Sequence, residues 1–201
     1  YLTSSINISS AQAGFLVTAA TLGYGLARFP SGILADIIGC KRTIISSGFL
    51  MGVTVIAVGL APNYLSLALL TLIMGISTGL YITAGYTFTI LVSKDNQEAT
   101  FTAILENFGG LAATVAPLTV VFFLDNLNLG WRELFFTIGF SILVVNLLFM
   151  YFSANSSIED KDDLDFDYQL FKREMKEVLQ VFEDPELVKF IIWATLVGGF
   201  G

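Results

Sequence analysis

A polar and basic segment separates two long apolar runs of the chain: Gly32-Ile33-Leu34-Ala35-Asp36-Ile37-Ile38-Gly39-Cys40-Lys41-Arg42. The apolar runs extend from Ala11 to Leu34 and from Thr43 to Leu60. The charged residues Asp36, Lys41 and Arg42 therefore stand in a connection that is too short to be a domain. This pattern predicts a tight turn at one face of a membrane.

The composition places the whole chain in a lipid bilayer. Of its 201 residues 55% are hydrophobic, and its mean hydropathy is +0.75, whereas soluble domains are typically about 45 to 50% apolar. Several apolar runs reach the roughly 20 residues that a helix needs to cross the hydrocarbon layer. The runs are continuous and do not alternate, which favours helices over a barrel. We therefore expect an all-α, multi-pass transmembrane helical bundle with the bilayer as its surroundings.

Polar breaks divide residues 1–153 into five complete spans. Ser9 with Gln12, and Asp95 with Glu98, have the spacing of capping boxes, and Asn63 is placed to cap a third helix. Small residues predict close helix contacts, both in the two GxxxG spacings and in the first span. The spans are Ala11–Leu34, Thr43–Leu60, Tyr64–Val92, Ala99–Leu124 and Trp131–Phe152, and the small residues are Gly48 with Gly52, Gly75 with Gly79, and Gly14, Gly23, Gly25 and Gly32.

The remainder of the chain differs in composition. Between Ser153 and Pro185 ten acidic residues face four basic ones, which accounts for −6 of the formal net charge of −7. We interpret residues 154–185 as a linker that contains an amphipathic helix, and residues 186–201 as the start of a further span. The negative charge thus describes a linker, and the lack of basic patches argues against nucleic acid as a partner.

The distribution of Lys and Arg predicts the orientation of the spans. Lys41, Arg42, Lys94 and the linker bases fall on one side if the spans alternate, and Arg132 falls on the other. By the positive-inside rule the turn and the linker are cytoplasmic and the protein is a multi-pass protein of the cell membrane.

The turn segment resembles the signature loop between the second and third helices of the major facilitator superfamily of secondary transporters. It fits the pattern G-x-L-A-D-x-x-G-x-[KR]-[KR] at Gly32, Leu34, Ala35, Asp36, Gly39, Lys41 and Arg42. It departs from the family at Ile37 and Cys40, where Arg is usual. The alternative interpretation is a generic short loop with inside-facing positive charge.

The resemblance implies a fold and a mechanism. The spans would correspond to helices two to six and the beginning of helix seven, so that the first helix and most of the C-terminal bundle are missing from this chain. The family fold is two six-helix bundles around a central cavity, which opens alternately to the two sides of the membrane. The Asp and the basic residues of the loop would hold one conformation of the carrier.

Two ionisable residues inside the spans are candidates for substrate binding or coupling. Arg28 lies eight residues before Asp36, and Glu106 lies eight after Glu98, so each is about 12 Å above the cytoplasmic edge. Arg28 can attract an anionic group of the substrate, and Glu106 can carry a coupling proton. The alternative is that both make structural polar contacts near the inner mouth. Tyr81, Tyr86 and Asn107 are further candidates to line the cavity, with core packing as their alternative.

The sequence thus predicts a monomeric secondary transporter that moves a small solute by alternating access, as an ion- or proton-coupled symporter. A sensor or scaffold that keeps the same fold is the alternative. We expect no enzyme, because no nucleophile is paired with a base. With no His and a single Cys in the chain, we expect neither a metal nor another cofactor.

Overall fold

The computed structural model describes residues 8–93, 97–127 and 130–153, together with six isolated residues between 172 and 189. The chain divides into two compact units, Tyr1–Asp162 and Asp163–Gly201. In the second unit the isolated residues are helical, and Lys189 Nζ forms an ion pair with Glu186 Oε1 at 2.8 Å. The predicted linker, its amphipathic helix and the start of a further span otherwise lie outside the described residues.

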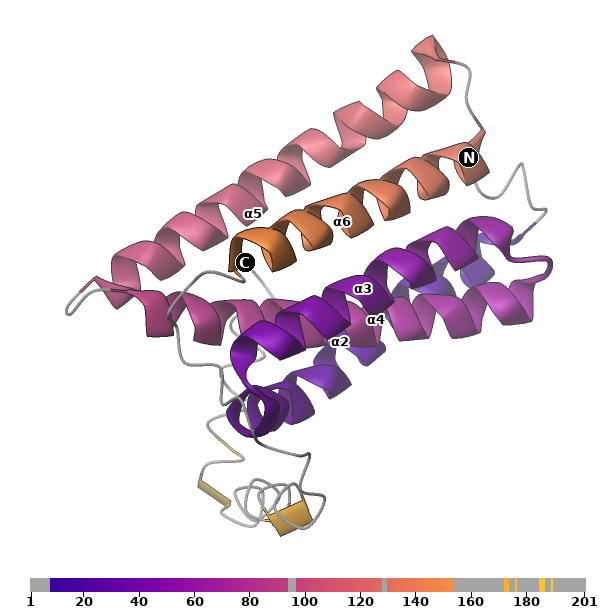
Figure 1. The fold of residues 1–201 in the computed structure, drawn as a ribbon. Coiled ribbons are helices and arrows are strands. Elements are labelled where there is room, and N and C mark those ends of the chain that lie inside the picture. Colours follow the sequence, from indigo (N-terminus) through magenta and orange to yellow (C-terminus); the bar gives the residue numbers. More distant parts are fainter. Residues whose placement is uncertain are drawn as a thin grey trace. The chain divides into compact units, whose positions relative to one another are not determined.

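Helices make up the described part of the first unit (Figure 1). Within the described ranges every regular element is helical, as predicted, and the last turns of the fourth helix are wound as a π-helix. The elements are α2 (Ser10–Ile38), α3 (Cys40–Leu60), α4 (Tyr64–Val92), α5 (Glu98–Val121), the π-helix η1 (Phe122–Asn126) and α6 (Trp131–Ser153).

Four of these segments are long and apolar enough to cross a membrane: α3, α4, the continuous Glu98–Asn126 and α6. The fifth predicted span, α2, has 29 residues but is not among them. The all-α bundle is therefore confirmed, while the count of five spans stays a prediction.

The starts of α2 and α4 follow from local side-chain chemistry. Ser9 Oγ accepts a hydrogen bond from the Gln12 backbone N at 3.2 Å, and Gln12 Oε1 accepts one from the Ser9 N at 2.8 Å. Asn63 and Ser66 form the same reciprocal box at the start of α4. Both predicted caps are thus confirmed. Each stabilises the start of its helix by satisfying backbone N–H donors that have no partner within the helix. The N-cap of α5 is Gln97, without a side-chain hydrogen bond, and Asp95 lies outside the described residues.

Backbone-to-backbone contact joins α2 to α4. A Cβ added at Gly75 would overlap the carbonyl of Ala20, and one added at Gly79 would lie 2.5 Å from the Tyr24 carbonyl oxygen. In return, a Cβ at Gly23 would overlap the α4 backbone. These glycines therefore let the two helices approach more closely than any larger residue would allow, as the Gly75–Gly79 spacing predicted.

A second close contact joins α3 to α6. A Cβ at Gly52 would lie 2.6 Å from Leu143 Cδ2, and one at Gly139 would lie 2.9 Å from the Gly52 carbonyl oxygen. Next to this contact the buried Asn146 Nδ2 donates to the Ile45 carbonyl at 2.9 Å. The Gly48–Gly52 spacing thus also marks a helix interface, as predicted.

The corresponding prediction for the first span is wrong for three of its four glycines. Gly14, Gly25 and Gly32 have open space where a Cβ would be, and Gly23 alone meets a neighbouring helix. The reason is geometric, because only one stripe of α2 faces α4 and the sequence does not reveal the rotation of the helix.

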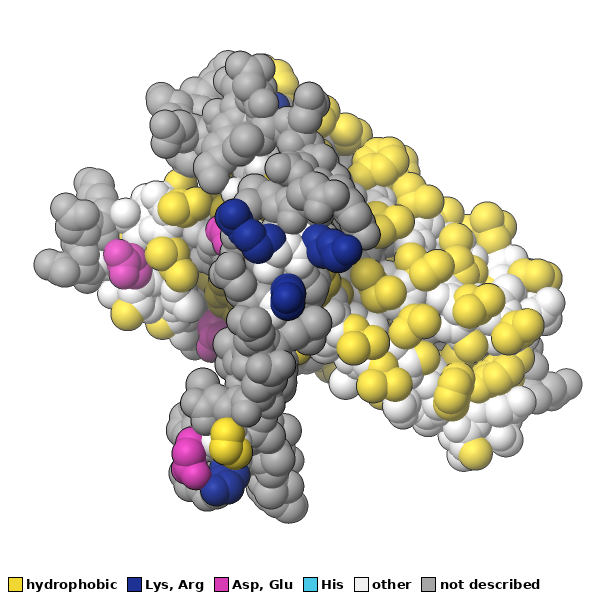
Figure 2. Space-filling view, turned by 90° about the horizontal axis from the view of Figure 1, so that it is seen from below, with side chains coloured by type: hydrophobic (Ala, Val, Ile, Leu, Met, Phe, Trp, Pro, Cys, Tyr) yellow, Lys and Arg dark blue, Asp and Glu magenta, His cyan; other side chains and the backbone are white. Residues whose placement is uncertain are grey.

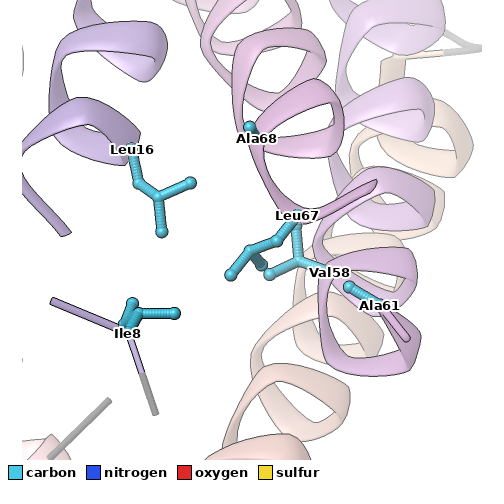
Figure 3. Close-up of a cluster of buried hydrophobic side chains, with 6 residues drawn as sticks. All are labelled: Ile8, Leu16, Val58, Ala61, Leu67 and Ala68. Atoms are coloured by element: carbon cyan, nitrogen blue, oxygen red, sulfur yellow. The ribbon is translucent and has the colours of Figure 1, made fainter. Parts of the chain in front are cut away.

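The ends of α2, α3 and α4 meet in a small apolar core (Figure 3). Its buried residues are Ile8, Leu16, Val58, Ala61, Leu67 and Ala68. Elsewhere large apolar side chains cover much of the visible surface of the bundle (Figure 2). The exposed apolar residues of the chain include Leu26, 68% exposed, and Phe108, 67% exposed. Such a surface fits a hydrocarbon environment.

Helix α5 lies at the edge of the bundle (Figure 1) and buries none of its residues. The π-helix η1 that continues it also buries none, whereas α2, α3, α4 and α6 each have buried residues. Helix α5 is consequently the described span that packing constrains least.

Replacing Gly75 by Ala should lower the stability of the bundle, because the added methyl group meets the Ala20 carbonyl. We expect a loss of about 1 to 3 kcal/mol, measured as a lower melting temperature of the purified full chain in detergent. Gly85→Ala on the same helix is the matched control, since a Cβ there meets open space. Equal melting temperatures for the two variants would contradict the close α2–α4 contact.

Candidate functional site

A hollow of 500 Å³ lies between α3, α4, α5 and α6. Apolar side chains form most of its wall, and Phe88 and Phe149 pack edge to face there with their ring centroids 5.8 Å apart. Its polar members are Tyr81, Tyr86, Thr89 and Glu106. An apolar pocket with a few polar groups is the usual design of a small-molecule site.

The Glu106 carboxylate is held by a tyrosine on the neighbouring helix. Tyr86 Oη on α4 donates a hydrogen bond to Glu106 Oε1 on α5 at 3.1 Å. Tyr86 is half-buried, whereas Glu106 is exposed in the structure. Two of the predicted cavity residues are thus in direct contact, and a third, Tyr81, lines the same hollow.

Arg28 is placed by another tyrosine, Tyr24 of α2. The Arg28 Cζ lies 4.9 Å from the centroid of the Tyr24 ring, within the range of a cation–π contact. The Tyr24 backbone is in turn fixed by its contact with Gly79 of α4. Both Arg28 and Tyr24 lie within electrostatic range of the Tyr86 hydroxyl. Arg28 is therefore near the Tyr86–Glu106 pair, although it does not line the 500 Å³ hollow.

Asn107 faces a different part of α5. It lines a shallow hollow of 460 Å³ together with Glu106, Gly110, Leu111 and Thr114. Its Nδ2 donates to the Ala103 carbonyl, one turn back on the same helix, at 2.7 Å. Asn107 is thus not brought together with Tyr81 and Tyr86, whereas Glu106 borders both hollows.

Two polar residues of this region were missed by the sequence analysis. Tyr24 lies four residues before Arg28, a spacing that puts two side chains on one helix face, and that signal was available. Asn146 was also visible, as the only amide within the apolar span Trp131–Phe152. Its Oδ1 is buried without a hydrogen-bond partner among the described residues and lies against Gly48.

The predicted cytoplasmic turn is shorter than the sequence suggested. Helix α2 continues through Asp36 to Ile38, and α3 already begins at Cys40, so Gly39 alone separates them. Gly39 has φ 90° and ψ 144°, a conformation that is almost restricted to glycine. Its carbonyl accepts hydrogen bonds from the Thr43 N at 3.1 Å and from Thr43 Oγ1 at 2.9 Å. Glycine is thus needed at this position for the chain to reverse within one residue.

The charges on both sides of Gly39 oppose the helix dipoles. Asp36 lies in the last turn of α2, where the dipole disfavours a negative charge, and Lys41 and Arg42 lie in the first turn of α3, where it disfavours positive charge. Such placements cost roughly 0.3 to 1 kcal/mol each when partly exposed. The helix dipoles alone therefore do not explain these residue types.

A comparison with known families assigns the chain. The family model described as Major Facilitator Superfamily matches residues 1–201. The chain belongs to the Major Facilitator Superfamily. A search of curated proteins finds no match to the chain.

Membership in the Major Facilitator Superfamily confirms the resemblance carried by the turn between α2 and α3. Together with the membrane-length helices, it identifies a membrane protein and supports a transport function. The superfamily is generally non-enzymatic. The roles of the individual residues Arg28, Tyr81, Tyr86, Glu106 and Asn107 stay predictions.

Proposed function

We propose that this Major Facilitator Superfamily chain transports a small anionic solute by alternating access and couples that movement to protons. Glu106 is the coupling residue in this proposal, and Arg28 attracts the anionic group. The proposed carrier is a monomeric symporter of the cell membrane with the Gly39 turn on the cytoplasmic side.

The observation that carries the proposal is the hydrogen bond from Tyr86 to Glu106 at the wall of the 500 Å³ hollow. An ionisable side chain inside a membrane span is costly, so its presence favours a functional role. Glu106 is the only charged residue of α5 after Glu98 in the first turn. A carboxylate that borders two hollows and accepts one hydrogen bond from the described residues is well suited to exchange a proton with water.

Arg28 supports the anionic character of the solute. The guanidinium lies over the Tyr24 ring, and Arg28 is exposed. Among the residues that the structure describes, no carboxylate forms an ion pair with it. A guanidinium recognises carboxylates and phosphates with two parallel hydrogen bonds. It also compensates for the charge of an anion in a poorly solvated site.

The turn at Gly39 supports the assignment of its side to the cytoplasm. Lys41 and Arg42 are held in the first turn of α3 against the helix dipole, and positive charge at the ends of spans is typical of the cytoplasmic face. Asp36, one turn before Gly39, completes the charge cluster that would hold one conformation of the carrier.

Replacing Arg28 by Ala should reduce uptake of an anionic solute about tenfold or more at low concentration, because a charged hydrogen bond is worth about 1.5 to 3 kcal/mol. The measurement is uptake by the full chain in proteoliposomes, with a panel of radiolabelled monocarboxylates, dicarboxylates, inorganic phosphate and uncharged sugars. Arg132→Ala is the matched control, since Arg132 also stacks on a ring, that of Trp131, but lies at the other end of the bundle. Equal uptake by the two variants, or uptake of sugars alone, would contradict the role of Arg28.

Replacing Glu106 by Gln should abolish proton-driven accumulation and leave exchange of solute across the membrane intact. The amide keeps the size of the side chain and an acceptor for Tyr86 but cannot take up a proton. Accumulation under an imposed pH gradient and counterflow without a gradient are measured on the same proteoliposomes. Glu133→Gln, at the exposed start of α6, is the control. The coupling role fails if the Glu106 variant still accumulates solute when the outside is made acidic.

A further inference from the structure

Three basic residues of the second unit, Lys172, Arg173 and Lys176, are helical and exposed. Lys172 and Lys176 are four residues apart, a spacing that puts two side chains on the same face of a helix. Basic side chains that gather in this way attract phosphate and carboxylate groups. This part of the second unit therefore presents positive charge to its surroundings.

The sequence around these lysines is amphipathic. Apolar residues recur every three or four positions at Phe171, Met175, Val178 and Phe182, so a helix over this stretch has one apolar stripe. Lysines beside such a stripe are typical of helices that lie in the interface of a membrane. There the apolar side chains enter the acyl boundary, and the lysines extend to the head groups. The pattern thus indicates a lipid surface as the partner.

The charge of this stretch differs from that of the linker as a whole. Residues 159–167 contain six acidic residues and one Lys, whereas residues 168–182 contain three basic and two acidic residues. The excess of positive charge therefore coincides with the apolar stripe. Anionic head groups attract basic residues that lie close to the membrane, while they repel the acidic run that precedes this stretch. Charge complementarity thus favours an anionic lipid surface.

The bilayer is also within reach of these lysines. Helix α6 is long and apolar enough to cross a membrane and ends at Ser153. Eighteen residues separate Ser153 from Lys172, and a chain of this length spans at most about 65 Å when fully extended. Such a tether keeps the local concentration of lipid high around the stretch, so that a weak affinity is sufficient for binding.

We propose that residues 168–182 bind the surface of the bilayer, with the apolar stripe in the acyl boundary and with Lys172 and Lys176 on the phosphates of anionic lipids. This binding fixes the middle of the linker to the membrane on the side where α6 ends. The inference goes beyond the proposed function and does not depend on it, because neither the solute nor the 500 Å³ hollow takes part.

The proposal is tested by a spin label at Met175→Cys, in the full chain with Cys40→Ser in lipid nanodiscs. Oxygen dissolves in lipid and a nickel chelate dissolves in water, so their effects on the label report whether it enters the bilayer. In discs that contain phosphatidylglycerol, oxygen should reach the label and the nickel chelate should not. A label at Gln180→Cys, on the opposite face of the helix that the pattern predicts, should stay accessible to nickel.

Lys172→Gln combined with Lys176→Gln should lower the ratio of lipid-bound to water-exposed label at Met175→Cys. We expect a loss of about fivefold for each lysine, because each basic residue near an anionic surface contributes roughly this factor to binding. Lys161→Gln combined with Lys189→Gln is the matched control, since it removes the same charge outside residues 168–182, and it should keep the ratio. Discs of phosphatidylcholine alone should lower the ratio and abolish the difference between the variants.

Three results would overturn the proposal. A label at Met175→Cys that stays accessible to nickel in the anionic discs places the apolar stripe in water. A label that is shielded from both reagents indicates packing against protein. A label that enters the lipid to the same extent in both lipid mixtures, and in the Lys172 and Lys176 variant as in its control, contradicts the binding of these lysines to anionic head groups.

Discussion

The contact between the backbones of α2 and α4 is the constraint on which the rest of the bundle depends. In a bilayer no water separates the helices, so they are held by van der Waals packing and interhelical hydrogen bonds and not by the hydrophobic effect. Gly75 and Gly79 allow α4 to touch the carbonyls of Ala20 and Tyr24 directly, and buried Ser31 donates to the Leu80 carbonyl at 2.9 Å across the same interface. Helix α3 then joins α6 through Gly52 and Gly139.

This rigid contact determines where the candidate residues lie. The backbone of Tyr24 packs against Gly79, and the Arg28 guanidinium lies over the Tyr24 ring. Further along α4, the Tyr86 hydroxyl donates a hydrogen bond to Glu106. The rigid helices thus position one side of the site, and the loosely packed α5 supplies the other. A carrier needs both properties, because its cavity has to be defined and yet able to change.

Much of the fold was predictable because membrane helices obey local rules. The continuous apolar runs, the caps at Ser9 and Asn63 and the GxxxG spacings each follow from the chemistry of neighbouring residues. The position of the turn was predicted correctly, but the predicted turn was longer than the single residue Gly39 that separates α2 from α3. The sequence alone does not show whether Asp36 lies in a helix or in a loop. The contact of Tyr86 with Glu106 was not predictable, because it depends on the rotation of α4 and α5 about their axes. For the same reason Gly14, Gly25 and Gly32 were assigned to an interface that they do not form.

The central proposal is that Arg28 and Glu106 both face water inside the membrane, with Glu106 at the wall of the 500 Å³ hollow and Arg28 outside that hollow. It is tested most directly by the reaction of single cysteines with a membrane-impermeant thiol reagent, in the full chain in membranes with Cys40→Ser. Arg28→Cys and Glu106→Cys should react, whereas Leu26→Cys and Phe108→Cys, at positions that are 68% and 67% exposed on the apolar surface, should be shielded by lipid. Reaction at the two apolar positions with protection of Arg28→Cys and Glu106→Cys would contradict the account.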